Sequence, residues 1–271
     1  MKLAISNIAW TNEEEPAVAE FLQSVGVKYI ELAPTKRWGE PVQASQSEIE
    51  QYKQWWAKYE IDVVAFQSML FAHPDYMLFK SEANRNITKK YLKDFIVLAG
   101  KMGAERMVFG SPKNRQKGDM SIEVAREIAI QLFSELSEVA IQNNTILCIE
   151  PNAPQYNCDF ITTAKEGLDL VKKVGSQGFG LHLDLACMTL AGDDIGKSIR
   201  DAGDDLKHFH ISSPMLAQVE DRSDVAHRDA AQLLSDINYS GFVSIEMRPG
   251  DQGTNVERVM EAITFAQSVY S

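Results

Sequence analysis

The chain has 271 residues, 45% of them hydrophobic, and a formal net charge of −11 at pH 7. An α/β barrel can reach this length undivided, so we expect a single domain over residues 1–271. The acidic balance argues against a nucleic-acid partner, whose surface needs clustered lysine and arginine side chains.

Short apolar runs and amphipathic segments alternate along the first half of the chain. Strands are expected over residues 3–8 and 27–32 and within residues 61–70 and 105–115. The segments with helical periodicity are 14–23, 46–60, a long one ending near Met102, and 121–140.

The same alternation continues through the second half. Four apolar runs read ILCIE, GLHLD, KHFHIS and VSIEM. The helical segments between and after them are 163–174, 193–203, 226–237 and 255–267.

Eight strand signals that alternate with eight helical signals predict parallel strands joined by helical crossovers. We therefore expect an α/β fold, a single (β/α)8 TIM barrel. The structural alternative is an open doubly wound sheet, which usually binds a dinucleotide through GxGxxG after its first strand. That position reads ISNIAWTNEEE here, which favours the barrel.

Each of the last four apolar runs ends near a residue that can bind a metal. Glu150, Asp184, His210 and Glu246 follow one another at intervals of 26 to 36 residues, the spacing of successive strand-helix units. In such barrels the active site lies at the carboxyl ends of the strands. Taken singly, an acid at a strand end is most often a helix cap or a solvated rim residue. Their coincidence on four consecutive strands predicts one metal site.

Strand alternation places a second polar side chain below each proposed ligand, because residues two apart share one face of a strand. Below these ligands, and also facing inward, lie Cys148, His182, His208 and Ser244. We expect the two histidines to support the ligands rather than bind the ion. Three carboxylates and one imidazole favour Mn²⁺ or Mg²⁺, with Zn²⁺ or Co²⁺ as alternatives.

Cysteine usage and hydropathy bear on the cellular location. Three cysteines without CxxC spacing indicate neither a disulfide framework nor a zinc knuckle. The first residues lack the apolar core of a signal peptide, and no run is long enough to cross a bilayer. We expect a cytoplasmic protein without a membrane partner.

The strand endings IEPN, HLD, FHIS and SIEM resemble those of the sugar phosphate isomerase/epimerase superfamily of xylose isomerase-like TIM barrels. The segments MKLAISNIAW, GVKYIELAPTK, AFQSMLF and VFGSPKNR extend this resemblance over nearly the whole chain. By similarity to the ketose 3-epimerases, the four proposed ligands match those of one divalent ion. In that family the residues matching Glu150 and Glu246 also move protons on opposite faces of the substrate.

The resemblance implies a divalent-metal-dependent isomerase or epimerase that acts on a small sugar or sugar phosphate. A bound cation can acidify a C–H beside a carbonyl and stabilise the enediolate, with Glu150 and Glu246 as catalytic base and acid. Reprotonation at the same carbon gives epimerisation. Reprotonation at the adjacent carbon gives aldose–ketose isomerisation.

Two polar residues that the ketose 3-epimerases carry near the metal ligands are absent from this chain. The ketose 3-epimerases carry a histidine three residues after the aspartate ligand and an arginine six residues after the histidine ligand, where this chain has Cys187 and Leu216. Lys113 and Arg248 point to an anionic substrate group, although any rim residue could equally be a surface residue. The candidate substrate-binding residues are Asn7, Glu31, Gln67, Lys113, Asn152, Cys187, His227 and Arg248.

Three alternatives stay open at this point. A dehydratase or lyase of a polyol or keto-sugar would begin with the same proton abstraction. A non-catalytic sugar-binding barrel would keep the fold without turnover. An apurinic-site endonuclease of this superfamily is disfavoured, because it needs three zinc ions and more histidines than the five here. A homo-oligomer is compatible with all of these.

Overall fold

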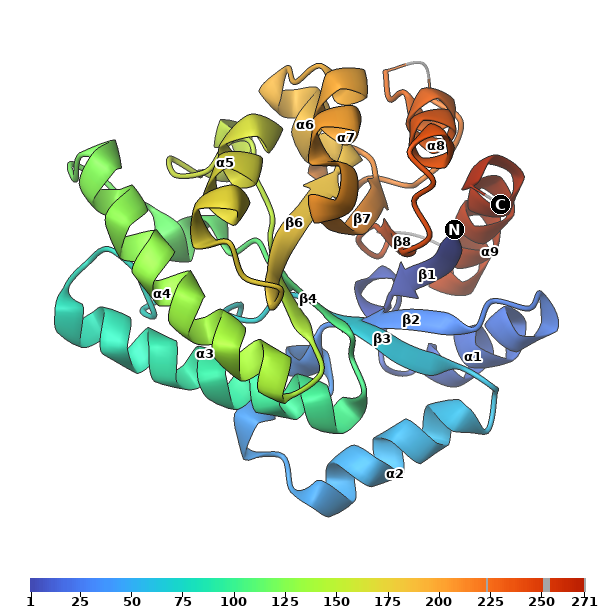
Figure 1. Cartoon of the computed structure of the whole chain (residues 1–271). Coiled ribbons are helices and arrows are strands. Elements are labelled where there is room, and N and C mark those ends of the chain that lie inside the picture. The colour runs from blue at the N-terminus through green and yellow to red at the C-terminus, as the bar shows by residue number, and fades with distance from the viewer. Residues whose placement is uncertain (223, 251–253, 271) are drawn as a thin grey trace.

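The computed structural model describes residues 1–222, 224–250 and 254–270. Within these residues, eight parallel strands form a closed barrel in sequence order, and the last strand pairs with the first (Figure 1). The strands are β1 (Lys2–Ser6), β2 (Tyr29–Leu32), β3 (Asp62–Phe66), β4 (Arg106–Phe109), β5 (Ile146–Ile149), β6 (Phe179–Asp184), β7 (Leu206–Ser212) and β8 (Phe242–Glu246). The closed barrel confirms the fold expected from the sequence.

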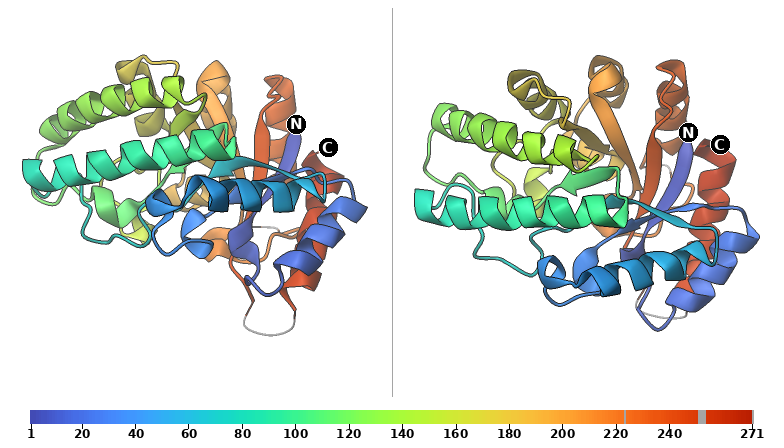
Figure 2. Two further views of the ribbon diagram at one scale, coloured as in Figure 1. Left: turned by 90° about the horizontal axis from the view of Figure 1, so that it is seen from below. Right: turned by 60° about the horizontal axis from the view of Figure 1, so that its bottom comes forward.

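Helices surround the strands and shield them from solvent (Figures 1 and 2). The α-helices are α1 (Glu15–Ser24), α2 (Gln46–Ala57), α3 (Glu82–Met102), α4 (Ile122–Gln142), α5 (Ala164–Val174), α6 (Leu185–Ala191), α7 (Ile195–Ala202), α8 (His227–Asp236) and α9 (Asn255–Tyr270). The long helices α3 and α4 lie side by side and extend past the barrel on one flank (Figure 2). In the described part of the chain, no helix is both long and apolar enough to span a bilayer.

Several helices begin where the sequence supplies a capping side chain. The hydroxyls of Ser45, Ser81, Ser121 and Thr163 each accept a hydrogen bond from a backbone amide in the first turn of α2, α3, α4 and α5. Such caps satisfy amides that have no partner within the helix and contribute about 1 kcal/mol each. The expected starts at residues 46, 121 and 163 agree with those of α2, α4 and α5 to within a residue.

The described residues contain one α-helix more than expected, the two-turn α6 directly after β6. The sequence LACMTLA continues the apolar run of β6 without a break, so periodicity does not separate the two elements. The chain passes from β6 to α6 at Asp184, which caps the helix: its Oδ1 accepts a hydrogen bond of 2.6 Å from the backbone N–H of Cys187. The helix ends at Gly192, which has a positive φ of 72°.

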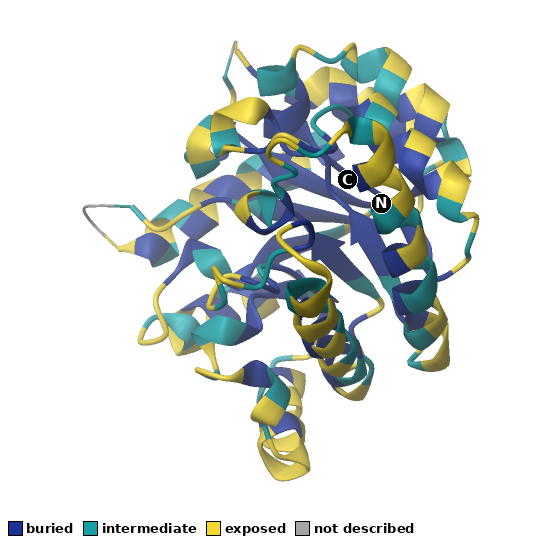
Figure 3. Cartoon of the chain, turned by 90° about the vertical axis from the view of Figure 1, so that its left-hand side faces the viewer, coloured by how far each residue is buried: buried dark blue, intermediate teal, exposed yellow. Residues whose placement is uncertain are grey.

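The barrel strands are buried on both faces, whereas the outer faces of the helices are exposed (Figure 3). Outward-facing strand residues, among them Ile149, Leu183, Phe209 and Ile245, pack in the main hydrophobic core beneath the helices. A small apolar cluster of Ala4, Val64 and Phe242 fills part of the barrel interior. Above it the interior is polar, and this polar layer supports the candidate site.

Candidate metal centre

The structure brings the four proposed ligands together at the carboxyl ends of adjacent strands. Asp184 ends β6, Glu246 ends β8, and Glu150 directly follows β5. His210 lies in β7 and pairs in register with Asp184. One ligand atom each from Glu150, Asp184, His210 and also His182 lie within 4.8 Å of one another. Glu246 joins them, because its Oε2 lies 3.4 Å from His210 Nδ1.

Two atoms at the middle of this group lack hydrogen-bond partners. Asp184 Oδ2 and His210 Nδ1 are buried and unpaired among the described residues, and they lie 3.6 Å apart. A buried polar atom without a partner costs about 1–3 kcal/mol. A cation held between them would satisfy both atoms, and the oxygen-rich donor set suits a hard divalent ion. The residues therefore fit a metal ion.

The acids of the group oppose one another's ionisation. Burial, followed by the charges of Glu246 and Asp184, raises the pKa of Glu150 to about 8. Burial also raises the pKa of Glu246. Burial opposes protonation of His210, but the negative charges of Glu31 and Glu246 raise the pKa of this imidazole well above its usual value. An excess of buried negative charge is the electrostatic condition that a divalent cation relieves.

Glu31 fixes the orientation of His210. The Glu31 carboxylate is fully buried, and its Oε2 lies 2.9 Å from His210 Nε2. Burial opposes its ionisation, but the adjacent imidazole of His210, followed by that of His208, lowers its pKa to about 2. A carboxylate bound to one imidazole nitrogen directs the other nitrogen toward a metal. In His210 the nitrogen left for the metal is Nδ1. Glu31, expected at the rim, lies instead beneath the ligands.

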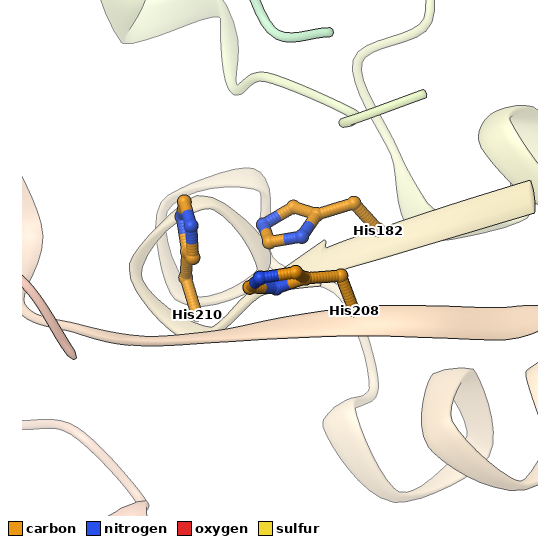
Figure 4. Close-up of side chains that lie close together, drawn as sticks. All are labelled: His182, His208 and His210. Carbon is orange, nitrogen blue, oxygen red and sulfur yellow. The ribbon is translucent and has the colours of Figure 1, made fainter. Parts of the chain in front are cut away.

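Two further imidazoles lie beside His210 in the barrel interior (Figure 4). The ring of His182 is 4.1 Å from that of His210, centroid to centroid, and the ring of His208 is 5.3 Å away. Burial lowers the pKa of His208 to about 4 and that of His182 well below its usual value, so both rings are neutral. Neither ring nitrogen of either histidine has a hydrogen-bond partner among the described residues. His182 is thus placed as a fifth potential donor to the ion.

Glu150 is positioned by residues that the sequence analysis did not single out. The buried Arg115 donates from Nη2 to the backbone oxygen of Glu150 at 2.6 Å and to Asn152 Oδ1 at 2.7 Å. A Cβ atom at Gly110 would overlap the carboxylate of Glu150, so this position leaves the space that the acid occupies. The segment GSPKNR, in which Lys113 was the candidate substrate-binding residue, carries both residues.

A cavity of about 170 Å³ opens above the metal-binding residues. Of the candidate substrate-binding residues, Gln67, Asn152 and Cys187 line it, next to Glu150, Asp184 and Glu246. Tyr156, which the sequence analysis did not consider, also lines this cavity and accepts a hydrogen bond of 3.0 Å from the backbone N–H of Met215.

The other candidate substrate-binding residues lie away from this cavity. Asn7 and His227 are buried, and Asn7 Oδ1 accepts a hydrogen bond from the backbone N–H of Ala33 while His227 Nδ1 lies 3.0 Å from the Tyr270 hydroxyl. Lys113 is exposed. Arg248 lines a second cavity on the other side of Glu246.

Comparison with known proteins places this barrel in a family. A family model described as a xylose isomerase-like TIM barrel matches residues 19–268. The chain belongs to this family. The match covers most of the chain and confirms the resemblance carried by the strand endings.

Curated proteins with detectable sequence similarity to this chain include D-psicose 3-epimerases. That of Enterocloster bolteae is 27% identical over 174 residues, which are 63% of this chain and 55% of the relative. That of Ruminiclostridium cellulolyticum is 32% identical over 147 residues, which are 52% of this chain and 47% of the relative. The aligned region spans about half the length of these relatives.

Solved structures share the fold over the whole chain. A D-psicose 3-epimerase crystallised in the presence of D-fructose has a TM-score of 0.82 at 20% identity, with 100% of this chain and 99% of that chain covered. The D-psicose 3-epimerase from Clostridium cellulolyticum H10 with D-tagatose has a TM-score of 0.80 at 19% identity, with both chains fully covered. At these identities the likeness establishes the fold.

Proposed function

We propose that this chain is a divalent-metal-dependent isomerase or epimerase that acts on a small sugar or sugar phosphate. The observation that carries the proposal is the convergence of Glu150, Asp184, His210 and Glu246 around two unpaired buried atoms. The sugar epimerases among the sequence relatives and structural neighbours support the reaction class. A cytoplasmic location and homo-oligomeric assembly remain predictions.

The same four residues would hold the ion, and their oxygen-rich donor set favours Mn²⁺ or Mg²⁺ over Zn²⁺ or Co²⁺. When bound, such an ion would polarise the substrate carbonyl and stabilise the enediolate. The surrounding residues have separate tasks. Glu31 holds His210 in position, and Arg115 holds the backbone of Glu150.

Glu150 and Glu246 are proposed to move the proton. They come from β5 and β8, at opposite ends of the arc of ligand-bearing strands. The raised pKa of each carboxyl group favours uptake of a proton, which a general acid or base must bind and return. One glutamate would remove the proton from the carbon beside the carbonyl, and the other would deliver a proton to the opposite face or to the neighbouring carbon.

Deuterium exchange tests this proposal directly. The purified protein, stripped with a chelator and reloaded with Mn²⁺, Mg²⁺, Zn²⁺ or Co²⁺, would be incubated with ketohexoses, ketopentoses and their phosphates in deuterated water. We expect solvent deuterium at a carbon beside the carbonyl, detected by NMR and mass spectrometry. Exchange should require the metal.

Isosteric variants assign the proton transfer. Glu150→Gln and Glu246→Gln should each lower exchange by about 100-fold or more, the usual contribution of a general acid or base. Glu138→Gln changes an exposed glutamate on α4 and should leave exchange unchanged. Undiminished exchange in both site variants would assign the proton transfer to other groups. No exchange with any sugar or metal would overturn the proposed function.

A further inference from the structure

A second, larger cavity adjoins the first across the mouth of the barrel. Its volume is about 560 Å³, compared with about 170 Å³ above the metal-binding residues. Ser68, Leu216 and Glu246 line both cavities, so the two spaces meet at a proposed catalytic side chain. The smaller cavity lies below the roughly 300–1,000 Å³ typical of ligand pockets, whereas the larger one lies within that range.

The wall of the larger cavity is mainly apolar. Ile8, Phe71, Leu216 and Pro249 line it, and the ring of Phe71 is 81% exposed. Because Phe71 is part of the mainly apolar wall of a cavity, its exposed ring is available to a ligand in that cavity. Its face can pack against another aromatic ring or against the apolar C–H face of a sugar ring.

The charged residues around the cavity do not form an anion site. Lys36 lines the cavity, but its ammonium group donates to the backbone oxygens of Asn7 and Trp10. Arg248 is exposed, and two carboxylates, Glu13 and Glu246, line the same space. This balance favours a neutral group over a phosphate.

Leu216 is held at the junction by its own backbone. Met215 and Leu216 both have positive φ values, 60° and 56°, which are unfavourable for residues with a Cβ atom. Two hydrogen bonds hold this segment: Met215 N–H donates to the Tyr156 hydroxyl, and Arg248 N–H donates to the Leu216 oxygen at 2.9 Å. The apolar side chain therefore borders both cavities, at the position where the ketose 3-epimerases have an arginine.

We infer that the substrate is a keto-sugar joined by a glycosidic bond to a second, neutral ring. This inference rests on the proposed function, because the hydroxycarbonyl end must lie at the metal centre. The second ring occupies the larger cavity and packs against Phe71 and Leu216. A free monosaccharide would leave this cavity empty and gain nothing from its apolar wall.

A matched pair of probes tests the inference: a ketohexose, and the same ketohexose carrying a glucosyl group on its O6. Both present the same carbonyl and neighbouring hydroxyl, so only the additional ring differs. Calorimetric titration of the metal-loaded protein should show at least about tenfold tighter binding of the glucosylated sugar. The rate of solvent deuterium exchange at low substrate concentration should favour it by a similar factor.

Two variants locate the additional contact. Phe71→Ala should weaken binding of the glucosylated sugar by about two- to tenfold and leave the ketohexose unaffected. Ile87→Ala removes another exposed apolar side chain, 52% exposed on α3 and outside the cavity, and should change neither affinity.

The outcomes separate the two proposals. Equal affinity for the two sugars, no measurable binding of either, or an equal effect of Phe71→Ala on both would overturn the extended substrate. Preferential binding of the glucosylated sugar that depends on Phe71, without exchange on any sugar, would support the second binding site and overturn the isomerase or epimerase reaction.

Discussion

At the scale of single residues, His210 faces an acid at each ring nitrogen. Nε2 lies against Glu31 within the barrel, and Nδ1 points toward Asp184 and Glu246 at the mouth. Glu31 thereby restricts both the rotation of the ring and the choice of the nitrogen that carries the proton. Metal affinity should therefore depend on a residue that does not itself bind the ion.

Glu31→Gln tests this dependence. The amide keeps the size of the side chain but loses the negative charge, so metal affinity should fall by about 10- to 100-fold. Titration of the chelator-stripped variant with Mn²⁺ would measure the change, and circular dichroism would check the fold. Glu20→Gln, on the exposed face of α1, serves as the control. Unaltered Mn²⁺ affinity in Glu31→Gln would show that His210 is oriented by other contacts.

At the scale of elements, Asp184 is placed to serve both the proposed metal centre and a helix. Its Oδ1 caps α6 through the amide of Cys187, while its Oδ2 faces the proposed metal centre and has no hydrogen-bond partner among the described residues. The two oxygens of one carboxylate thus connect the end of β6 to the start of α6. Substitutions can separate these roles, because a cap needs only an acceptor whereas the ion needs a charged oxygen.

Asp184→Asn should therefore lose most of its metal affinity but keep the helix cap. Asp184→Ala should lose both and have a free energy of unfolding lower than that of Asp184→Asn by about 1 kcal/mol. Urea unfolding of the chelator-treated variants would measure the difference, and Mn²⁺ titration would measure affinity. Equal stability of the two variants would show that the cap contributes nothing.

The sequence predicts elements well where a side chain marks their ends. Ser45, Ser121 and Thr163 cap α2, α4 and α5, whose starts were expected to within a residue, whereas the uninterrupted apolar run after Asp184 concealed α6. The strand expected over residues 3–8 ends at Ser6, because Asn7 begins a 3₁₀ turn and bonds the amide of Ala33. That bond joins residues 26 apart, which no local pattern reveals.

At the scale of the whole molecule, the buried charges couple metal binding to stability. The pKa of Glu150 is about 8 in the folded protein, above the ordinary value near 4.3, so the folded state binds this proton more tightly. The resulting stabilisation is complete below that ordinary value and is lost as pH rises through about 8. The raised pKa of His210 acts in the same direction.

Burial keeps His182 and His208 neutral in the folded protein, and this opposes the trend below the ordinary histidine pKa near 6.5. The metal-free protein should accordingly lose thermal stability between about pH 6.5 and about pH 8. The increase in Tm on adding Mn²⁺ should grow over the same interval, because the ion binds deprotonated ligands. Thermal melts with chelator and with Mn²⁺ across this range would measure both trends. The Glu150→Gln variant has no carboxyl group at this position that could titrate. The metal-free Tm of this variant should therefore depend less on pH over this range. A metal-free Tm that rises between about pH 6.5 and about pH 8 would contradict the assignment.

The convergence of the four proposed ligands at the ends of the last four strands could be predicted, because period-two alternation fixes which side chains face the barrel interior. The residues around the proposed ligands could not be predicted from the sequence, because they come from loops in distant parts of the chain. The contact of Arg115 with Glu150 joins residues 35 apart, and the larger cavity combines loops that follow β8, β1, β2, β3 and β7.

This division of the barrel mouth has a practical consequence. The proposed ion ligands all come from β5 to β8, whereas most of the wall of the larger cavity comes from the loops after β1, β2 and β3 and from residues 248 and 249. The residues proposed to select the substrate and those proposed to bind the ion therefore lie in largely separate stretches of sequence. A library randomised only at positions such as Ile8, Thr35 and Phe71 could redirect the molecule toward new ligands while its reactive centre stays intact.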